Sequence, residues 1–171
     1  MNRTLHKGDQ IRFDPTLSVT INPDALFKTP RVHCKVTGDD ALNFIDEPIS
    51  IRSWELQGDD GSLFWLMEDK TETTDVWFLL RLVGESEHDQ RMPDWLTGET
   101  YDVATPTGTV VPFGYYSPAI MAKQGEDDLL FRAYVRPVGD TEEFLWIVLR
   151  NDAIVQHWVG VVIDPAQILP G

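Results

Sequence analysis

Four histidines and one cysteine are the side chains of this chain best suited to binding a metal or acting as a nucleophile. No two histidines stand two or four positions apart, the spacings that bring imidazoles together on a strand or a helix. His33 and Cys34 are adjacent, but adjacent residues of a strand point to opposite faces. A single cysteine also excludes an internal disulfide and a multi-cysteine zinc site. We therefore expect no metal centre and no cofactor.

The sequence signatures of common enzymes are absent. There is no Gly-x-Ser-x-Gly turn for a nucleophilic serine and no glycine-rich loop for a phosphate. Lys35 and His33 flank Cys34 and are of the kind that activates a thiol, although a lone cysteine in such a strand is more often a small core residue. The 28 acidic residues are too many for any one pair to indicate glycosidase chemistry. The motifs favour a protein that is not an enzyme.

The most distinctive segment, residues 110–118, carries Phe113, Tyr115 and Tyr116 among two prolines and a glycine. We place it on a connection rather than in the centre of a strand. Aromatic side chains on a rigid loop are favoured in recognition surfaces, because they bring contact area at little cost in entropy. In the alternative interpretation, Phe113 and Tyr115 cover an open end of the core. Trp95, which follows the charged stretch 84–91, is a second candidate for an exposed aromatic residue.

Two segments, 58–81 and 125–150, share one pattern: an acidic turn, a Leu-Phe strand and then a Trp-x-x-Leu-Arg strand. The pattern predicts two similar hairpins, related either by internal duplication or by chance. A pocket between them would be lined by Trp77, Trp146, Arg81 and Arg150, with the arginines meeting an anionic ligand. Otherwise the tryptophans belong to the core and the arginines to the surface. The acidic turns lack the spacing of an EF-hand loop, and acidic residues are common in solvated turns.

The net charge of −14 argues against nucleic-acid binding and against attraction to an anionic membrane surface. Solubility is the simplest reason for this charge, and a basic protein or polyamine partner is the alternative. No apolar run is long enough to span a bilayer, and the polar start of the chain does not read as a secretory signal. We expect a cytoplasmic protein.

Most of the chain alternates apolar and polar residues with a period of two, as half-buried antiparallel strands do. The expected strands are 10–13, 17–21, 32–36, 48–56, 63–68, 76–83, 101–104, 109–113, 129–136, 144–150 and 154–163. Two short helices are expected, one over 117–125 from its serine cap, proline and terminal glycine, and one over 22–28. No linker-like stretch divides the chain. The sequence thus predicts a single mainly-β domain over 1–171, an antiparallel sandwich or barrel-like sheet with one or two short helices.

The opening run KGDQIRFDPTL (7–17) and the closing part, from EEFLW (142–146) through VGV (159–161) to Ile168, resemble the start and finish of the YjfK-like family of uncharacterised bacterial proteins. Genes of that family tend to lie near genes for PspA-type membrane-stress proteins. The resemblance implies an accessory role around envelope stress and supplies no catalytic residues. In the middle of the chain, FWL (64–66) replaces the aromatic pair that follows an arginine in the family's first hairpin.

Three hypotheses for function follow. The first is a non-enzymatic interaction module that recognises a basic protein through Phe113, Tyr115, Tyr116 and Trp95. The second is a protein that binds or converts an anionic small molecule between the two hairpins, with Arg81 and Arg150 at the ligand. The third is a subunit of a homo-oligomer.

Overall fold

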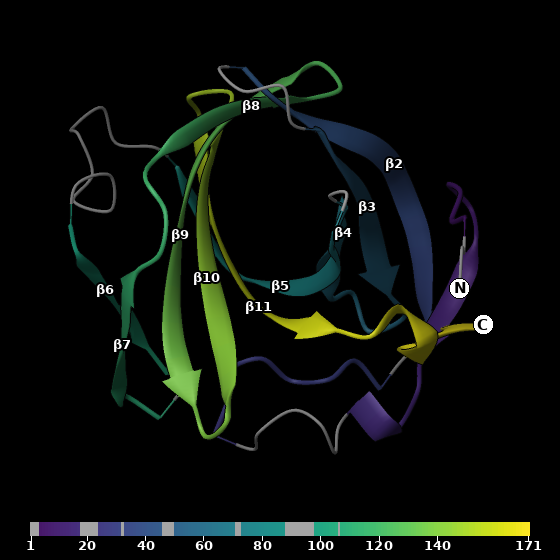
Figure 1. Cartoon of the computed structure of the whole chain (residues 1–171), viewed down its shortest axis with the longest axis horizontal. Coiled ribbons are helices and arrows are strands. Elements are labelled where there is room, and N and C mark those ends of the chain that lie inside the picture. The colour runs from purple at the N-terminus through teal and green to yellow at the C-terminus, as the bar shows by residue number, and fades with distance from the viewer. Residues whose placement is uncertain are drawn as a thin grey trace.

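Eight antiparallel strands close into a barrel, which Figure 1 views from one end. The computed structural model describes residues 4–17, 24–31, 33–45, 50–70, 73–87, 98–105 and 107–171. In order around the barrel, the strands are β2 (Cys34–Phe44), β3 (Ser50–Gly58), β4 (Leu63–Lys70), β5 (Asp75–Glu87), β11 (Ile154–Ile163), β10 (Thr141–Arg150), β9 (Asp127–Val138) and β8 (Ile120–Gln124). The pairing of β8 with β2 closes the ring. The expected mainly-β class is confirmed, and of the two expected architectures the structure is the barrel.

The inside of the barrel is packed with large side chains. One buried cluster takes residues from all eight strands and therefore lies within the ring: Leu42, Ile51, Trp65, Met67, Leu80, Ala122, Leu129, Phe131, Ala133, Phe144, Trp146, Val148 and Trp158. The rings of Phe131 and Trp146 stack at 5.0 Å, and Trp65 lies 5.4 Å from Trp158. Eight strands enclose a space just wide enough for such side chains, so these aromatic residues fill much of the interior.

A second buried cluster covers the outer face of the same strands. Trp54 and Trp77 stack at 5.3 Å on this face, and the indole of Trp54 donates a hydrogen bond to the carbonyl of Leu5 in the N-terminal segment. The pair β1 (Gln10–Phe13) and β12 (Ile168–Pro170) extends the sheet beside β2. The hairpin of β6 (Thr100–Ala104) and β7 (Val110–Tyr115) lies outside β9 (Figure 1). Strands with both faces covered explain why so much of the sequence is apolar.

The helix expected over 117–125 is wrong, because the chain there forms strand β8. Ile120, Ala122 and Gln124 point inward, and β8 bridges β9 and β2 through backbone hydrogen bonds. A helix of two turns is marginal by itself, so pairing on both sides outweighs its local signals. The second expected helix is also not formed where it can be followed, since 24–28 has no helical turn, and 22–23 lies outside the described residues. Of the strand expected at 17–21, Leu17 lies in a helical turn and 18–21 falls outside that description.

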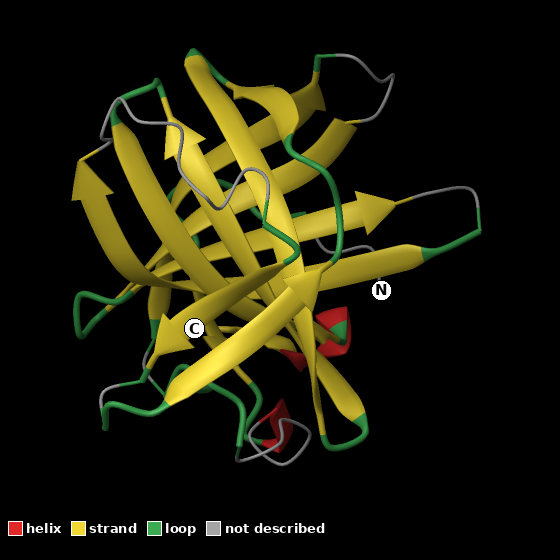
Figure 2. Ribbon diagram, turned by 90° about the vertical axis from the view of Figure 1, so that its left-hand side faces the viewer, coloured by secondary structure: helices red, strands yellow, loops and turns green. Residues whose placement is uncertain are grey.

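Helix is limited, in the described part of the chain, to short turns such as the 3-10 helix η2 (Pro165–Gln167), drawn red in Figure 2. None of these described helical segments has the length and apolar character needed to cross a membrane.

Strand β7 confirms the strand expected at 109–113 and continues to Tyr115, so the placement of segment 110–118 on a connection holds only after that residue. Pro112 is tolerated there because β7 pairs with β6 at that point and reaches β9 only at Gly114. The strand is interrupted at residues 116–119. The chain then pairs with the same edge of β9 again, as strand β8. One edge of β9 therefore serves an outer hairpin and the closed barrel in succession.

The aligned side chains of the two similar segments point to opposite faces of the sheet. On β11, Val159 pairs with Arg81 and belongs to the outer cluster, whereas Trp158 pairs with Trp146 and belongs to the inner one. Phe64 likewise lies in the outer cluster, while its counterpart Phe131 lies inside. The aligned residues therefore do not occupy equivalent positions in the barrel. A common origin of the two segments stays a prediction.

Candidate functional site at one mouth of the barrel

Three hairpin turns and the end of β5 meet at one mouth of the barrel, and all of them are acidic. The turns join β3 to β4, β8 to β9 and β10 to β11, and Glu87 at the end of β5 pairs with Ile154 at the start of β11. We call this end the acidic mouth. Its carboxylates are Asp59, Asp60, Glu85, Glu87, Glu126, Asp127, Asp128 and Asp152. Acidic turns that are far apart in the sequence thus converge on one opening.

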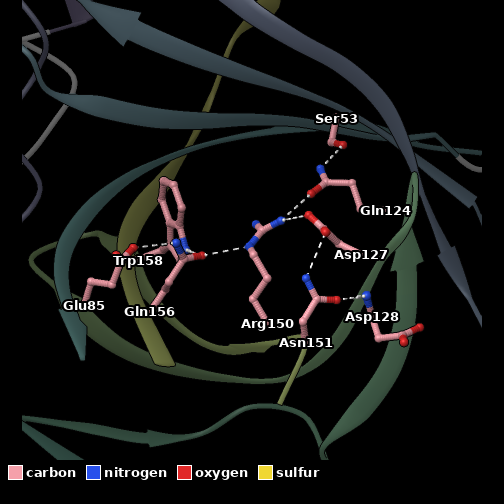
Figure 3. A network of polar contacts seen from close by, with 9 residues as sticks. All are labelled: Ser53, Glu85, Gln124, Asp127, Asp128, Arg150, Asn151, Gln156 and Trp158. Atoms are coloured by element: carbon pink, nitrogen blue, oxygen red, sulfur yellow. Dashed lines mark hydrogen bonds and ion pairs between the residues drawn. The ribbon is translucent and has the colours of Figure 1, made fainter. Parts of the chain in front are cut away.

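Arg150 is the centre of a polar network just inside this mouth (Figure 3). Its side chain is 16% exposed, and one terminal nitrogen donates to the Asp127 carboxylate at 2.8 Å and to the Gln124 amide oxygen at 3.3 Å. Its Nε donates to the amide oxygen of Gln156 at 3.3 Å. Three inward-facing polar side chains, from β8, β9 and β11, are therefore held by one guanidinium on β10.

The network continues on both sides of Arg150. Gln156 donates to Glu85 at 2.8 Å and accepts a hydrogen bond from the Trp158 indole at 3.3 Å. On the other side, Gln124 donates to the Ser53 hydroxyl at 2.8 Å. Each amide is thereby fixed in orientation, and the network spans the barrel wall from β3 to β5 by way of β8, β10 and β11.

Asn151 holds the turn after β10 against the start of β9. It has a φ of 53°, a left-handed conformation that asparagine adopts more readily than most residues. Its amide donates to Asp127 at 2.9 Å, and its oxygen accepts the backbone N–H of Asp128 at 2.8 Å. The hydrogen bonds from Asn151 and from Arg150 lower the pKa of Asp127. Asp127 is therefore a carboxylate at neutral pH.

A pocket of about 290 Å³ opens beside the network. Thr37, Glu55 and Leu63 line it from β2, β3 and β4, and Asp127, Arg150, Gln156 and Trp158 line it from the opposite strands. Glu55 shares the inward face with its partner Trp65, and no hydrogen bond or ion pair of its carboxylate is found among the described residues. The pocket therefore combines one neutralised carboxylate, one unpaired carboxylate, two fixed polar groups and an indole.

Of the predicted pocket residues, the structure places Arg150 in this site and Arg81 elsewhere. Arg81 lies on the outer face, over the Phe64 ring at 5.9 Å and 3.4 Å from the Ser62 hydroxyl. Trp77 is likewise outside, whereas Trp146 belongs to the aromatic filling of the barrel. The four residues do not line a common pocket.

The predicted aromatic surface is also divided. Phe113 is fully buried beneath Arg136, whose guanidinium lies 5.5 Å from its ring. Tyr115 and Tyr116 are 49% and 55% exposed, and the ring of Tyr116 contacts Phe144 at 5.2 Å. Arg132 lies 5.0 Å from the Tyr115 ring. Trp95 falls outside the described residues, so this surface consists here of the two tyrosines.

Sequence reasoning missed Gln124, Gln156, Asp127 and Trp158 as site residues. Their signal was available in part, because Gln156 and Trp158 share one face of an apolar strand and a glutamine is unusual on a buried face. Gln124 was hidden by the expected helix. None of these patterns shows that the residues meet, since their contact depends on the closure of the barrel.

Within the described residues, no group of three His, Cys, Asp or Glu side chains has a geometry that could hold a metal ion. Comparison of the chain with models of protein families, with curated proteins and with solved structures found no match.

Proposed function

We propose that this protein is a non-enzymatic binding protein that takes a small molecule into the acidic mouth of its barrel. The observation that supports this proposal is a pocket lined by the hydrogen-bonded network of Arg150. Mouths of β-barrels are common ligand sites, and polar groups fixed before binding lower the entropic cost of recognition. The pocket lies near the lower end of the range for drug-sized ligands, roughly 300–1,000 Å³, so it suits a small molecule.

The side chains of the pocket favour binding over catalysis. The described residues that line it include no histidine, cysteine or serine. Arg150 and Asp127 neutralise each other, and Gln156 is held by Glu85 and Trp158. General acid–base catalysis needs groups free to take up or release a proton, and the paired Arg150 and Asp127 do not provide one. Glu55 is unpaired, but the described lining offers it no second free titratable group.

A ligand screen by thermal shift, followed by NMR, tests this proposal. We expect at least one metabolite to raise the melting temperature and to shift the indole N–H signal of Trp158. A bulky Leu63→Trp change at the pocket wall should abolish both effects, whereas Val110→Trp on β7 should leave them intact, since both side chains are exposed in the native chain. A ligand that binds both variants equally, or a screen in which nothing perturbs Trp158, would contradict the proposal.

A second candidate is the interaction module for a basic protein. The exposure of Tyr115 and Tyr116 favours it, because large aromatic side chains at the surface are typical of recognition sites. The net charge of −14 would attract a basic partner and speed its association. The resemblance to the YjfK-like family adds the expectation that such a partner acts in envelope stress.

Affinity capture from the native host tests this second candidate. A stoichiometric partner should be recovered by the wild-type chain, less so at high salt, and poorly by the double variant Tyr115→Ala/Tyr116→Ala. Because Tyr116 also packs on Phe144, the melting temperature of the variant must first be shown to be close to that of the wild type. Recovery unaffected by the double substitution would exclude the tyrosines as the contact.

A further inference from the structure

We infer that the ligand of the acidic mouth is an organic cation, specifically a small molecule with a primary ammonium group. This inference rests on the proposed function and assigns the ligand a charge. It departs from the anionic ligand that two arginines suggested in the sequence. Three features of the pocket carry it: the balance of charge in the wall, the pairing of Arg150 with Asp127, and the presence of Trp158.

The charge of the pocket wall is negative. The lining holds two carboxylates, Glu55 and Asp127, and one positive charge, Arg150. Glu85 lies next to this wall as a third carboxylate, because it accepts a hydrogen bond from Gln156. Around this wall, the turns of the acidic mouth add further carboxylates, and Lys123 is taken up by Asp128 at 3.4 Å. Walls of one sign concentrate the field in an opening and raise the local concentration of oppositely charged ligands. The field at this mouth therefore attracts cations.

The charge of Arg150 is already paired with the Asp127 carboxylate. Its Nε and one terminal nitrogen donate to Gln156, Gln124 and Asp127, and its second terminal nitrogen has no hydrogen bond among the described residues. A carboxylate or phosphate bound at that second nitrogen would lie on the same guanidinium as Asp127, and the two anions would repel each other. The Arg81 guanidinium, which could have added a second positive charge, lies on the other face of the sheet. An anion would therefore share one guanidinium with Asp127 and would gain no second positive charge from Arg81.

Glu55 and Trp158 supply what an ammonium group needs. Glu55 is an exposed residue that lines the pocket, and its carboxylate has no hydrogen bond or ion pair among the described residues, so it is available as an acceptor. Trp158 also lines this space, and an indole is the aromatic side chain that attracts a cation most strongly. A short alkyl chain next to the ammonium group would pack against Leu63 and the indole.

The test is a calorimetric titration with three probes of equal chain length that differ in charge: cadaverine, pentanediol and glutarate. We expect cadaverine to bind with measurable heat, and both other probes to bind at least about tenfold more weakly. Glu55→Gln should weaken cadaverine about fivefold, near the upper end for one partly exposed ion pair. Glu142→Gln, which makes the same change in net charge at an exposed position of β10, should leave the affinity unchanged.

The outcomes separate this inference from the proposed function. Glutarate or pentanediol binding better than cadaverine, with a shifted Trp158 signal, would overturn the cationic ligand and leave a small-molecule site in place. Cadaverine binding that Glu55→Gln, Leu63→Trp and Glu142→Gln all leave unchanged would show a diffuse counterion effect, and would overturn the inference. If none of the probes and no metabolite perturbs Trp158, the proposed function fails as well.

Discussion

Arg150 on β10 donates to Asp127 on β9 across 2.8 Å, while its Nε reaches Gln156 on β11. One side chain thereby joins three neighbouring strands on the inside of the barrel, at the mouth where a ligand would enter. The network is thus both a structural element and the wall of the pocket.

Replacing Arg150 with methionine should destabilise the fold by about 2 kcal/mol, because Gln124, Gln156 and Asp127 each lose a charged donor. Urea unfolding of Arg150→Met, Asp127→Asn and the double variant would give the coupling between the two side chains. We expect a coupling of about 1 kcal/mol, since Asp127 is 42% exposed and solvent weakens the pair. Strictly additive effects would show that the ion pair contributes nothing to stability.

Glu143 is a buried carboxylate that secures the N-terminal segment. It accepts the Phe27 backbone N–H at 2.6 Å and the Arg136 Nε at 2.8 Å. Glu143→Gln should lower the free energy of unfolding by about 3 kcal/mol, because it leaves the Arg136 charge without its partner. The exposed neighbour Glu142→Gln is the control and should change stability by less than about 0.5 kcal/mol in the same urea experiment. Equal effects at the two positions would refute this role.

His157 makes the stability depend on pH. It lies on the outer face, 2.9 Å from the Tyr101 hydroxyl, and burial lowers its pKa below the usual 6.5. In the unfolded chain the imidazole takes up a proton at about pH 6.5, while in the fold it stays neutral to lower pH, so stability falls as the pH drops below about 6.5. Urea unfolding between about pH 7.5 and pH 5 should show this loss, and His157→Gln should reduce it. His6→Gln, at an exposed position, should retain it.

Gly160 lies opposite Leu80 where β11 pairs with β5, and the two strands leave no room there for a side chain. A Cβ at this position would overlap the carbonyl oxygen of Leu79 and the side chain of Leu80. Gly160→Ala should therefore cost about 1–3 kcal/mol, the usual range for overpacking. Gly84→Ala on β5 is a matched control, since its Cβ would meet His157 at an ordinary 3.9 Å. Thermal unfolding that ranks Gly84→Ala as the more harmful change would contradict this packing.

Cys34 should be inert in the folded protein. It is fully buried, and burial, followed by the charges of Asp60 and Asp59, raises its pKa to about 11. A thiol reagent at neutral pH should modify it slowly in buffer and rapidly in concentrated urea, because the thiolate is the reactive form. Rapid modification without denaturant would instead support the hypothesis that Lys35 and His33 activate the thiol of Cys34.

Local patterns in the sequence predicted most of the strands. The alternation of Leu129, Phe131 and Ala133 with Leu130, Arg132 and Tyr134 marks β9, and the structure keeps these two sets on opposite faces. Such alternation predicts half-buried strands, but the second face of β9 is covered as well, since Tyr134 is as buried as Phe131. The strand pattern does not reveal which neighbouring segments cover an outer face.

The site was predicted only in part. Arg150 was a candidate from its motif, but its supposed companion Arg81 lies on the other face, since similar motifs need not enter the sheet in the same phase. In a strand, a shift of one residue reverses every side chain. The residues that do surround Arg150 come from β8, β9 and β11.

By itself, the sequence determined the composition of the barrel: a period of two that commits the chain to strands, acidic turns between them, and enough aromatic residues to fill an interior. The tertiary structure decided the rest. It turned 120–124 into a strand by pairing Leu42 with Gln124, and that pairing closed the ring and brought the acidic turns to one mouth. The physical reason is that backbone pairing between distant segments depends on partners that no local pattern specifies, and only closure defines an inside in which Arg150, Glu55 and Trp158 meet.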